Sequence, residues 1–224
     1  MSQPTSEHDF TSRYAEGATP WEIGTVQPAI EQWADLIRGH VLDAGCGTGE
    51  TSFFFAARGC LVTGVDAEAA AIAEAERKKR SLIEGGAEVP VEFVQTDIRD
   101  LAALPGTFDS VVDCLTFHVF GDEDRIRYVS GLRQKLKPGG TLLVLVFSDQ
   151  EPPGEGPRRI SAYDLAKSFA RGFRCVDLHA VPIRMRSQDQ GKWSPGGPKG
   201  WLAQFERLSD DVIDPVKVDA PSVA

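Results

Sequence analysis

Short apolar runs alternate with longer helical patterns along most of the chain. Five of these runs are rich in Val, Leu or Ile and have the length of buried strands: residues 40–44, 61–65, 91–96, 110–114 and 141–147. Strands that alternate with helices are joined by crossover connections and lie parallel to one another. The pattern therefore predicts a doubly wound α/β fold with a mostly parallel sheet.

Three helical patterns lie in the gaps between these strands. Residues 50–58 and residues 68–84 are each followed by glycine, a frequent residue just past a helix end. Residues 122–136 carry apolar side chains at helical spacing and end before Pro138. We predict three crossover helices, the last leading into a strand that begins at Thr141.

The chain is less regular after the fifth predicted strand. A loop rich in glycine and proline at 151–157 leads to a predicted helix near residues 161–169 and a predicted strand at 173–183. A second such loop at 187–200 separates that strand from one at 200–207. We expect the two strands to form a C-terminal antiparallel hairpin. With it, the predicted sheet has seven strands.

The two ends differ from the rest. Residues 1–9 are polar, and residues 209–224 hold two prolines and little apolar material, so we expect mobile tails at both ends. Residues 10–208 suit a single domain with one core. Within it, residues 10–33 form an arm ahead of the first strand whose aromatic content, including Tyr14 and Trp21, exceeds what a leader would need.

Composition limits the function more than the fold. The chain has 224 residues, of which 42% are hydrophobic and 25% charged, as in ordinary soluble proteins. A formal net charge of -9 and a pI near 5.0 disfavour a nucleic-acid partner, because such binding depends on Lys and Arg. Neither a secretion signal nor a membrane span is recognisable.

The cysteines argue against a metal or redox centre. The four residues Cys46, Cys60, Cys114 and Cys175 lie far apart and form no C-x-x-C pair, so the sequence indicates neither a zinc site nor a redox dithiol. We expect no metal, and a cytoplasmic location fits unpaired cysteines.

The strongest chemical signal follows the first predicted strand. There the sequence Asp43-Ala44-Gly45-Cys46-Gly47-Thr48-Gly49 places glycines at alternate positions before a helix. Glycine lets the backbone approach a ligand closely, which predicts a nucleotide-like ligand at this strand end. A dinucleotide site would instead show G-x-G-x-x-G. A carboxylate at Asp43 would repel a pyrophosphate but suit an α-amino group, such as that of S-adenosylmethionine.

Two further aspartates end the next two predicted strands. Asp66 follows Val65, where an acidic side chain can accept hydrogen bonds from both ribose hydroxyls. Asp97 follows Thr96 and is predicted to bind the exocyclic amine of adenine, with Ile98 packing against the ring. Either aspartate would alternatively cap the turn or helix that follows it.

Taken together, residues 41–147 resemble a class I S-adenosylmethionine-dependent methyltransferase. The resemblance includes the glycine motif, the two later aspartates, Phe108-Asp109-Ser110-Val111-Val112 and Leu136-Lys137-Pro138-Gly139-Gly140-Thr141-Leu142. It implies a Rossmann-like methyltransferase fold with S-adenosyl-L-methionine as cofactor. The cofactor contacts it implies are Asp43, Gly45, Cys46, Gly47, Thr48, Gly49, Asp66, Ala67, Asp97, Ile98 and Cys114.

A narrower resemblance lies outside that core. Thr19-Pro20-Trp21-Glu22-Ile23-Gly24, Phe117-His118-Val119-Phe120 and Gly156-Pro157-Arg158-Arg159 are similar to segments of thiopurine-methyltransferase-like small-molecule enzymes. That group implies a lid arm at residues 10–33, with Trp21 near the methionine part of the cofactor and Tyr14 roofing the pocket. Enzymes of this kind methylate S or O atoms of heterocycles and quinolones.

The predicted acceptor contacts are Tyr14, His118 and Arg158. His118 lies four residues past Cys114, near the rim of the predicted pocket, and is our candidate general base. It would alternatively hydrogen-bond the backbone of a loop. Arg158 is a candidate contact for an anionic group of the acceptor, although an arginine in such a loop is commonly solvated.

Three functions remain open from the sequence. The first is methyl transfer to an O, S or N atom of a small, aromatic or heterocyclic acceptor. The others are a nucleotide-dependent oxidoreductase and a cofactor-binding protein without turnover. No basic groove or added domain indicates a protein or nucleic-acid substrate. The acceptor, the methylated atom, the need for a base and the oligomeric state are not determined by the sequence.

Overall fold

The computed structural model describes residues 10–154, 156–186 and 192–210. The predicted tail at 1–9 and, beyond Asp210, the predicted tail at 209–224 lie outside the described residues, as does part of the predicted loop at 187–200. No helix in the described part of the chain is both long and apolar enough to cross a membrane.

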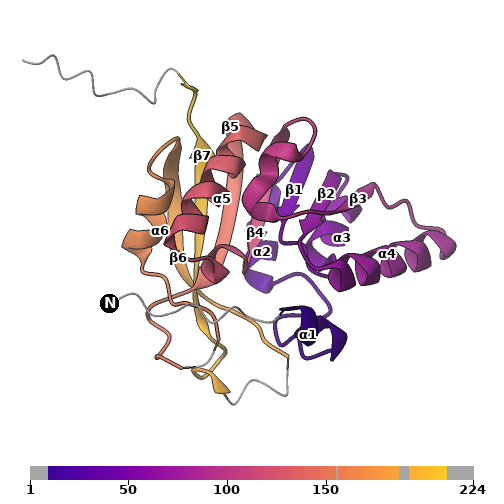
Figure 1. The fold of residues 1–224 in the computed structure, drawn as a ribbon, viewed down its shortest axis with the longest axis horizontal. Coiled ribbons are helices and arrows are strands. Elements are labelled where there is room, and N and C mark those ends of the chain that lie inside the picture. The colour runs from indigo at the N-terminus through magenta and orange to yellow at the C-terminus, as the bar shows by residue number, and fades with distance from the viewer. Residues whose placement is uncertain (1–9, 155, 187–191, 211–224) are drawn as a thin grey trace, which may run out of the picture.

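A seven-stranded sheet forms the centre of the molecule, with the strand order β3-β2-β1-β4-β5-β7-β6 (Figure 1). The strands from β1 to β5 are parallel, whereas β7 is antiparallel to both β5 and β6. This arrangement confirms the predicted doubly wound fold and its C-terminal antiparallel hairpin. The strand bounds are β1 His40–Ala44, β2 Leu61–Asp66, β3 Val91–Gln95, β4 Phe108–Cys114, β5 Leu136–Phe147, β6 Phe173–Pro182 and β7 Lys199–Arg207.

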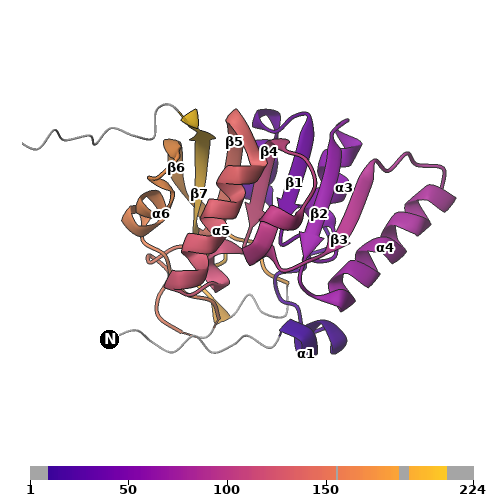
Figure 2. The ribbon, with the colours of Figure 1, turned by 45° about the horizontal axis from the view of Figure 1, so that its top comes forward.

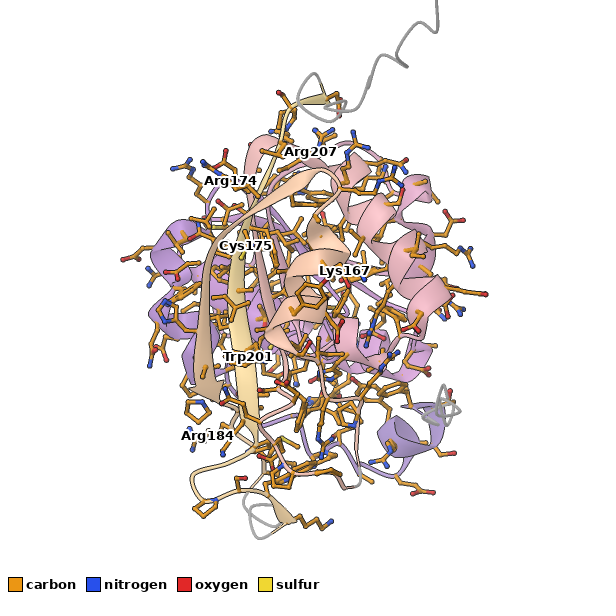
Figure 3. All side chains as sticks on the ribbon, turned by 90° about the vertical axis from the view of Figure 1, so that its left-hand side faces the viewer. Lys167, Arg174, Cys175, Arg184, Trp201 and Arg207 are labelled. Atoms are coloured by element: carbon orange, nitrogen blue, oxygen red, sulfur yellow. The ribbon has the colours of Figure 1, made fainter. Side chains whose placement is uncertain are left out.

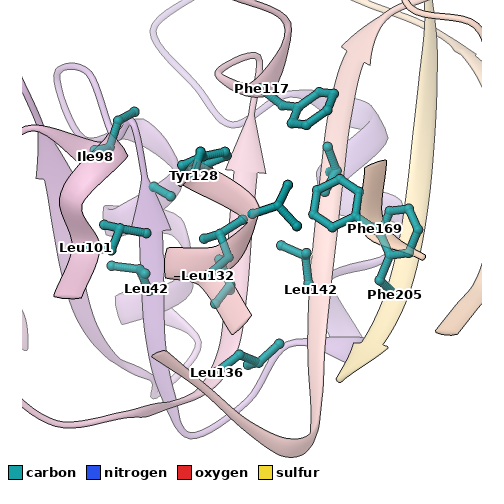
Figure 4. Close-up of a cluster of buried hydrophobic side chains, with 14 of the residues drawn as sticks. Leu42, Ile98, Leu101, Phe117, Tyr128, Leu132, Leu136, Leu142, Phe169 and Phe205 are labelled. Atoms are coloured by element: carbon teal, nitrogen blue, oxygen red, sulfur yellow. The ribbon is translucent and has the colours of Figure 1, made fainter. Parts of the chain in front are cut away.

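Helices cover both faces of the sheet, which gives the molecule two hydrophobic clusters. On one face, residues of α5 (Asp122–Lys135), α6 (Ala162–Phe169) and the 3-10 helix η2 (Ile98–Ala103) join a cluster that includes Tyr128, Leu132 and Phe169 (Figures 2 and 4). On the other face, α2 (Pro28–Gln32), α3 (Glu50–Ala57) and α4 (Ala69–Glu84) contribute Ile30, Phe55 and Ala75. The remaining elements are α1 (Phe10–Ala15) and the 3-10 helices η1 (Ala34–Leu36) and η3 (Phe117–Val119).

One strand boundary differs from the prediction by more than two residues. The strand β5 begins at Leu136 rather than at Thr141, so it includes the Pro-Gly-Gly segment that the prediction left between the helix and the strand. Leu136 is fully buried and pairs with Phe108, and the register shifts between Phe108 and Ser110. Burial of Leu136 therefore keeps the segment in the sheet, while the irregularity accommodates residues that a regular strand would exclude.

The amino-terminal arm is fixed to the segment that follows β6. The side-chain amide of Gln27 donates to the carbonyl of Arg184 and accepts from its backbone N–H, both at 2.9 Å. The backbone N–H of Arg186 donates to the carbonyl of Pro20 at 2.9 Å. Figure 3 looks onto the edge strand β6 and labels Arg184 close to the loops beyond it. Two segments that are remote in sequence thus meet beyond the end of the sheet.

Candidate functional site

A cavity of about 1080 Å³ opens where the carboxyl ends of β1, β2 and β4 meet. Strand order reverses between β1 and its neighbours β2 and β4, which is where open α/β sheets bind ligands. The segment after β3, the arm, the loop after β5 and the loop before β7 supply most of the remaining lining. The cavity therefore draws on segments from the whole length of the described chain.

The glycine motif needs glycine for two separate reasons. Gly45, Gly47 and Gly49 have φ angles of +78°, +54° and +93°, a region that side chains strongly disfavour. A β-carbon at Gly45 would also lie 2.1 Å from Oγ1 of Thr116, and one at Gly47 would lie 3.0 Å from the hydroxyl of Tyr14. The loop is consequently packed against the turn after β4 and against the arm.

Asp43 lies beneath this loop with a carboxylate oxygen that lacks a partner. Its side chain is 1% exposed, and Oδ2 accepts a hydrogen bond of 2.6 Å from the hydroxyl of Ser52. Oδ1 is buried and has no partner among the described residues. Burial raises the pKa of Asp43 to about 7. A cationic group nearby would satisfy this oxygen and favour the ionised form.

Asp66 lines the cavity at the end of β2 and also braces the glycine loop. Its carboxylate accepts hydrogen bonds from the backbone N–H groups of Gly47 at 2.8 Å and Glu68 at 2.9 Å. Burial raises its pKa, although these hydrogen bonds act in the opposite direction. A carboxylate so fixed is oriented before any ligand arrives.

Asp97 lines the cavity too, but its carboxylate is already engaged. It accepts from the backbone N–H of Arg99 at 2.9 Å, and the Arg99 guanidinium donates to both oxygens. The ion pair with Arg99 lowers the pKa of Asp97. Asp97 thus caps η2, as the alternative interpretation allowed, while Ile98 is buried and lines the cavity.

Three side chains of the arm lie over the glycine loop. The indole N–H of Trp21 donates to the hydroxyl of Tyr14 at 3.4 Å, and both residues line the cavity. Glu22, which the sequence analysis did not single out, accepts from the backbone N–H of Thr48 at 3.1 Å. Burial raises the pKa values of Tyr14 and Glu22. The only sequence signal for Glu22 was its place beside Trp21.

The turn after β4 is held by a buried carboxylate. Oδ1 of Asp113 accepts from the backbone N–H groups of Thr116 at 2.9 Å and Phe117 at 3.1 Å. Its Oδ2 accepts from the hydroxyl of Tyr128 at 2.8 Å. Within this turn Leu115 has a φ of +70°, the one positive value at a non-glycine residue among those described. Such strain persists where the surroundings enforce it, often at functional sites.

His118 lines the cavity but its hydrogen bond argues against the predicted general base. The backbone N–H of Phe147 donates to Nδ1 of His118 at 3.0 Å, so the neutral ring carries its proton on Nε2. To accept a proton at Nδ1, the ring would have to give up this bond inside a buried site. The base role stays a prediction, and the geometry favours donation from Nε2.

The two adjacent arginines of the loop after β5 lie in different places. Arg158 is not among the residues that line the cavity, and its guanidinium pairs with Asp122 at 2.6 Å. This placement therefore does not support the predicted acceptor contact at Arg158. Arg159 lines the cavity instead, and its guanidinium carbon lies 5.3 Å from the ring centre of Phe147 and 5.5 Å from that of Trp193.

The structure brings most of the predicted site residues together around the cavity. Those that line it are Tyr14, Trp21, Gly45, Cys46, Gly47, Asp66, Ala67, Asp97, Ile98, Cys114 and His118. Asp43, Thr48 and Gly49 do not line it. Thr48 donates through its backbone to Glu22 and through its hydroxyl to Glu50, at 3.1 Å and 2.9 Å. These three residues support the wall from behind.

The part of the cavity around the glycine loop fits a cationic nucleoside. Four carboxylates line it, those of Glu22, Glu50, Asp66 and Glu68, and the unsatisfied oxygen of Asp43 lies behind it. S-adenosylmethionine carries an ammonium, a sulfonium and two ribose hydroxyls, all of which a carboxylate-rich wall favours. A pyrophosphate would be repelled here.

Comparison with known proteins places the chain among methyltransferases. The family model described as a methyltransferase domain matches residues 41–140. The chain is 30% identical, over 85% of its length and 82% of the relative's, to the 2-heptyl-1-hydroxyquinolin-4(1H)-one methyltransferase of Mycobacteroides abscessus. These matches agree with the carboxylate-rich wall and leave the oxidoreductase alternative without support.

Solved structures share the fold. One, from work on the conversion of a disulfide bond into a thioacetal group during echinomycin biosynthesis, has a TM-score of 0.74 and 30% identity, and covers 89% of this chain and 91% of that one. Another is the Burkholderia thailandensis 1,6-didemethyltoxoflavin-N1-methyltransferase with bound S-adenosylhomocysteine. It has a TM-score of 0.66 and 24% identity, and it covers 90% of this chain and 86% of that one. The latter likeness concerns the fold alone.

Proposed function

The chain belongs to the class I S-adenosylmethionine-dependent methyltransferases, and from this premise we propose that it methylates an O, S or N atom of a small aromatic or heterocyclic acceptor. The observation that carries the proposal is one cavity with two unlike walls. Carboxylates line the part around the glycine loop, whereas Phe147, Trp193 and Arg159 line the part formed by the loops after β5 and before β7. Pockets for single drug-sized ligands measure about 300–1000 Å³. At about 1080 Å³, this cavity lies at the upper end of that range, and its two walls suit a cofactor beside a compact acceptor.

Within this proposal, each wall has a binding role. Asp66 accepts from the ribose hydroxyls, Asp43 neutralises the ammonium group, and Ile98 packs against adenine. Trp21 and Tyr14 cover the cofactor from the arm, whose anchorage through Gln27 supports a lid at residues 10–33. Asp97 would reach the adenine amine only by sharing its carboxylate with Arg99, so that contact remains a prediction.

The protein contributes mainly position and exclusion of water. When bound, the cofactor supplies an electrophilic methyl group on a sulfonium sulfur. Such a transfer is accelerated by holding the acceptor atom in line with that group in a closed site. The strained turn at Leu115, held by Asp113, fixes the wall near Cys114 and Thr116. The backbone N–H of Phe147 donates to Nδ1 of His118 and so fixes the orientation of this ring in the wall of the cavity.

The charge of the chain and the state of its cysteines support a proposal for its partner and its cellular location. A net charge of -9 and the acidic cofactor wall oppose binding of nucleic acid, so we take the acceptor to be a free small molecule. All four cysteines are free thiols, which fits the reducing cytoplasm.

Calorimetry and mass spectrometry test this function together. S-adenosylhomocysteine should bind the wild-type protein, and Asp66→Asn should weaken binding about tenfold or more, since hydrogen bonds to a charged group contribute about 1.5–3 kcal/mol. Asp35→Asn is the matched control, because that carboxylate is 94% exposed and does not line the cavity. Incubation with S-adenosylmethionine and a panel of phenols, thiols and hydroxyquinolones should yield a singly methylated product. Absence of S-adenosylhomocysteine binding would refute the proposal.

A further inference from the structure

The acceptor wall, defined as Phe147, Glu151, Arg159 and Trp193, is built around a cation that lies against two neighbouring aromatic rings. The rings of Phe147 and Trp193 have centres 5.2 Å apart, and the Arg159 guanidinium packs against both. The guanidinium also donates to the carbonyl of Pro157 at 2.6 Å. Gly156, with a φ of +97°, allows this approach, because a β-carbon there would lie 3.0 Å from the Trp193 ring.

The positive charge of Arg159 is partly removed from water. Burial lowers the pKa of Arg159, and the nearby negative charge of Glu151 acts in the opposite direction. Both carboxylate oxygens of Glu151 accept backbone N–H groups, from Ser194 at 3.1 Å and Lys199 at 2.9 Å. Glu151 therefore also has a structural task, which is to join the two loops that frame this wall.

A second donor belongs to the same wall. The indole Nε1 of Trp193 is buried and has no hydrogen-bond partner among the described residues. A buried donor without a partner is unfavourable by about 1–3 kcal/mol. A cation and two aromatic rings thus line one part of the cavity, and an unsatisfied donor of the same tryptophan is buried behind its surface.

We infer that this wall binds the acceptor in its ionised form, as a planar anion whose charge is delocalised over an aromatic ring. The ring packs against Phe147 and Trp193, and Arg159 attracts the delocalised charge. The inference rests on the proposed function and narrows its acceptor to ionised phenols, thiophenols and N-hydroxyheterocycles. Guanidinium groups favour planar anions because they stack and present a fork of donors.

Methyl transfer to such an acceptor needs no base on the protein. The acceptor loses its proton to solvent before it binds. A lone pair of its ionised atom then forms the bond to the methyl carbon, while the bond from that carbon to the sulfonium sulfur breaks and leaves its electron pair on sulfur. The anionic acceptor becomes neutral, and the positively charged sulfonium becomes a neutral thioether. This balance agrees with a His118 ring whose Nδ1 is already occupied.

An alternative role for Arg159 is purely structural, as a clamp between the two loops. A clamp would support neutral and ionised ligands equally. A cationic site would distinguish them, because its attraction acts only on the ionised form. The other titratable side chains that line this part of the cavity are His118, Glu151 and Lys192, and none of them is altered in the variants below.

The test uses 4-nitrophenol, whose ionised form absorbs visible light, with full-length protein saturated with S-adenosylhomocysteine. Absorbance is followed against pH for free and bound probe. In the wild type, the bound probe should ionise at lower pH than the free probe. In Arg159→Met the shift should disappear and the ionised probe should bind about tenfold or more weakly, as expected when a charge-assisted contact is lost. Arg159→Lys should retain part of the shift.

Arg158→Gln is the matched control, because it removes the same charge one residue away, outside the cavity. It should behave as the wild type. Equal ionisation of the probe on wild type and Arg159→Met, or preferential binding of the neutral phenol by the wild type, would overturn the inference. If Arg159→Met fails to bind S-adenosylhomocysteine, Arg159→Lys with an unshifted probe would overturn it. Failure of the wild type to bind S-adenosylhomocysteine would instead overturn the proposed function and this inference with it.

Discussion

At the scale of single residues, the buried carboxyl of Asp43 should make the stability of the fold depend on pH. Its pKa of about 7 in the folded protein lies above the ordinary value of 3.8. Between these two values the folded protein holds a proton that the unfolded chain releases. The free energy of unfolding should therefore fall as pH rises through this window.

Asp43→Asn is expected to remove this part of the pH dependence. In the ligand-free protein, the free energy of unfolding of the variant should increase relative to that of the wild type by at least about 1 kcal/mol when the pH is raised from about 5 to about 8. One pKa unit corresponds to about 1.4 kcal/mol. Asp66, Glu22 and Asp113 also have raised pKa values, so some dependence remains. Urea unfolding at several pH values measures the effect, with Asp35→Asn as control. Parallel curves for wild type and Asp43→Asn would contradict it.

The same residue couples pH to cofactor binding in the opposite sense. The ammonium group of S-adenosylhomocysteine, when it lies beside Asp43, favours the ionised carboxylate, so wild-type affinity for this ligand should increase with pH up to about 7. The increase should be smaller in Asp43→Asn, which cannot ionise. The ionised carboxylate of Asp43 thus lowers the stability of the ligand-free protein and contributes to binding in the ligand-bound protein.

At the scale of elements, the turn after β4 depends on a contact with α5. The hydroxyl of Tyr128 and the carboxylate of Asp113 are fully buried, and the bond between them is 2.8 Å. Tyr128→Phe leaves an oxygen of Asp113 without its donor and should lower the free energy of unfolding by about 1–3 kcal/mol. Chemical denaturation measures this. Tyr163→Phe, at a tyrosine that is 71% exposed, should change stability little. Equal effects of the two substitutions would refute this account of the turn.

Elements were more predictable from the sequence than the contacts between them. The strands β1 to β4 and the helices α3 to α5 follow from apolar runs and glycine stops, which are local signals. The start of β5 was missed because burial of Leu136 outweighs the turn preference of Pro138 and its neighbours. The anchor between Gln27 and Arg184 joins residues 157 positions apart, and no local pattern encodes it.

Some site residues were likewise predictable from local sequence, whereas others were not. The glycine motif, Asp66 and Ile98 lie at strand ends, where the order of elements determines their place. Arg158 and Arg159 cannot be told apart by sequence, because the conformation of Gly156 and the packing of Trp193 decide which of them faces the cavity. Glu22 and Glu151 contribute through contacts across loops, which only the folded chain defines.

At the scale of the whole molecule, the cavity links the arm, the glycine loop, the turn after β4 and both later loops. A ligand that contacts all of these segments in the folded state alone should stabilise the entire fold. At one hundred times its dissociation constant, such a ligand adds about 2.7 kcal/mol to the free energy of unfolding. For a chain of this size, the corresponding rise in Tm is about 5–10 °C.

We expect this rise with S-adenosylhomocysteine and not with NAD. Gly45→Ala should abolish it, because a β-carbon there would lie 2.1 Å from Oγ1 of Thr116 and would displace the loop from the turn after β4. Gly86→Ala is the matched control. Its φ of +89° is equally unsuited to alanine but no atom lies within 4 Å, so it should lower the Tm of the ligand-free protein and keep the full rise. A thermal shift of similar size in Gly45→Ala would show that the ligand does not depend on the glycine loop as described, and a shift produced by NAD alone would contradict the proposed cofactor.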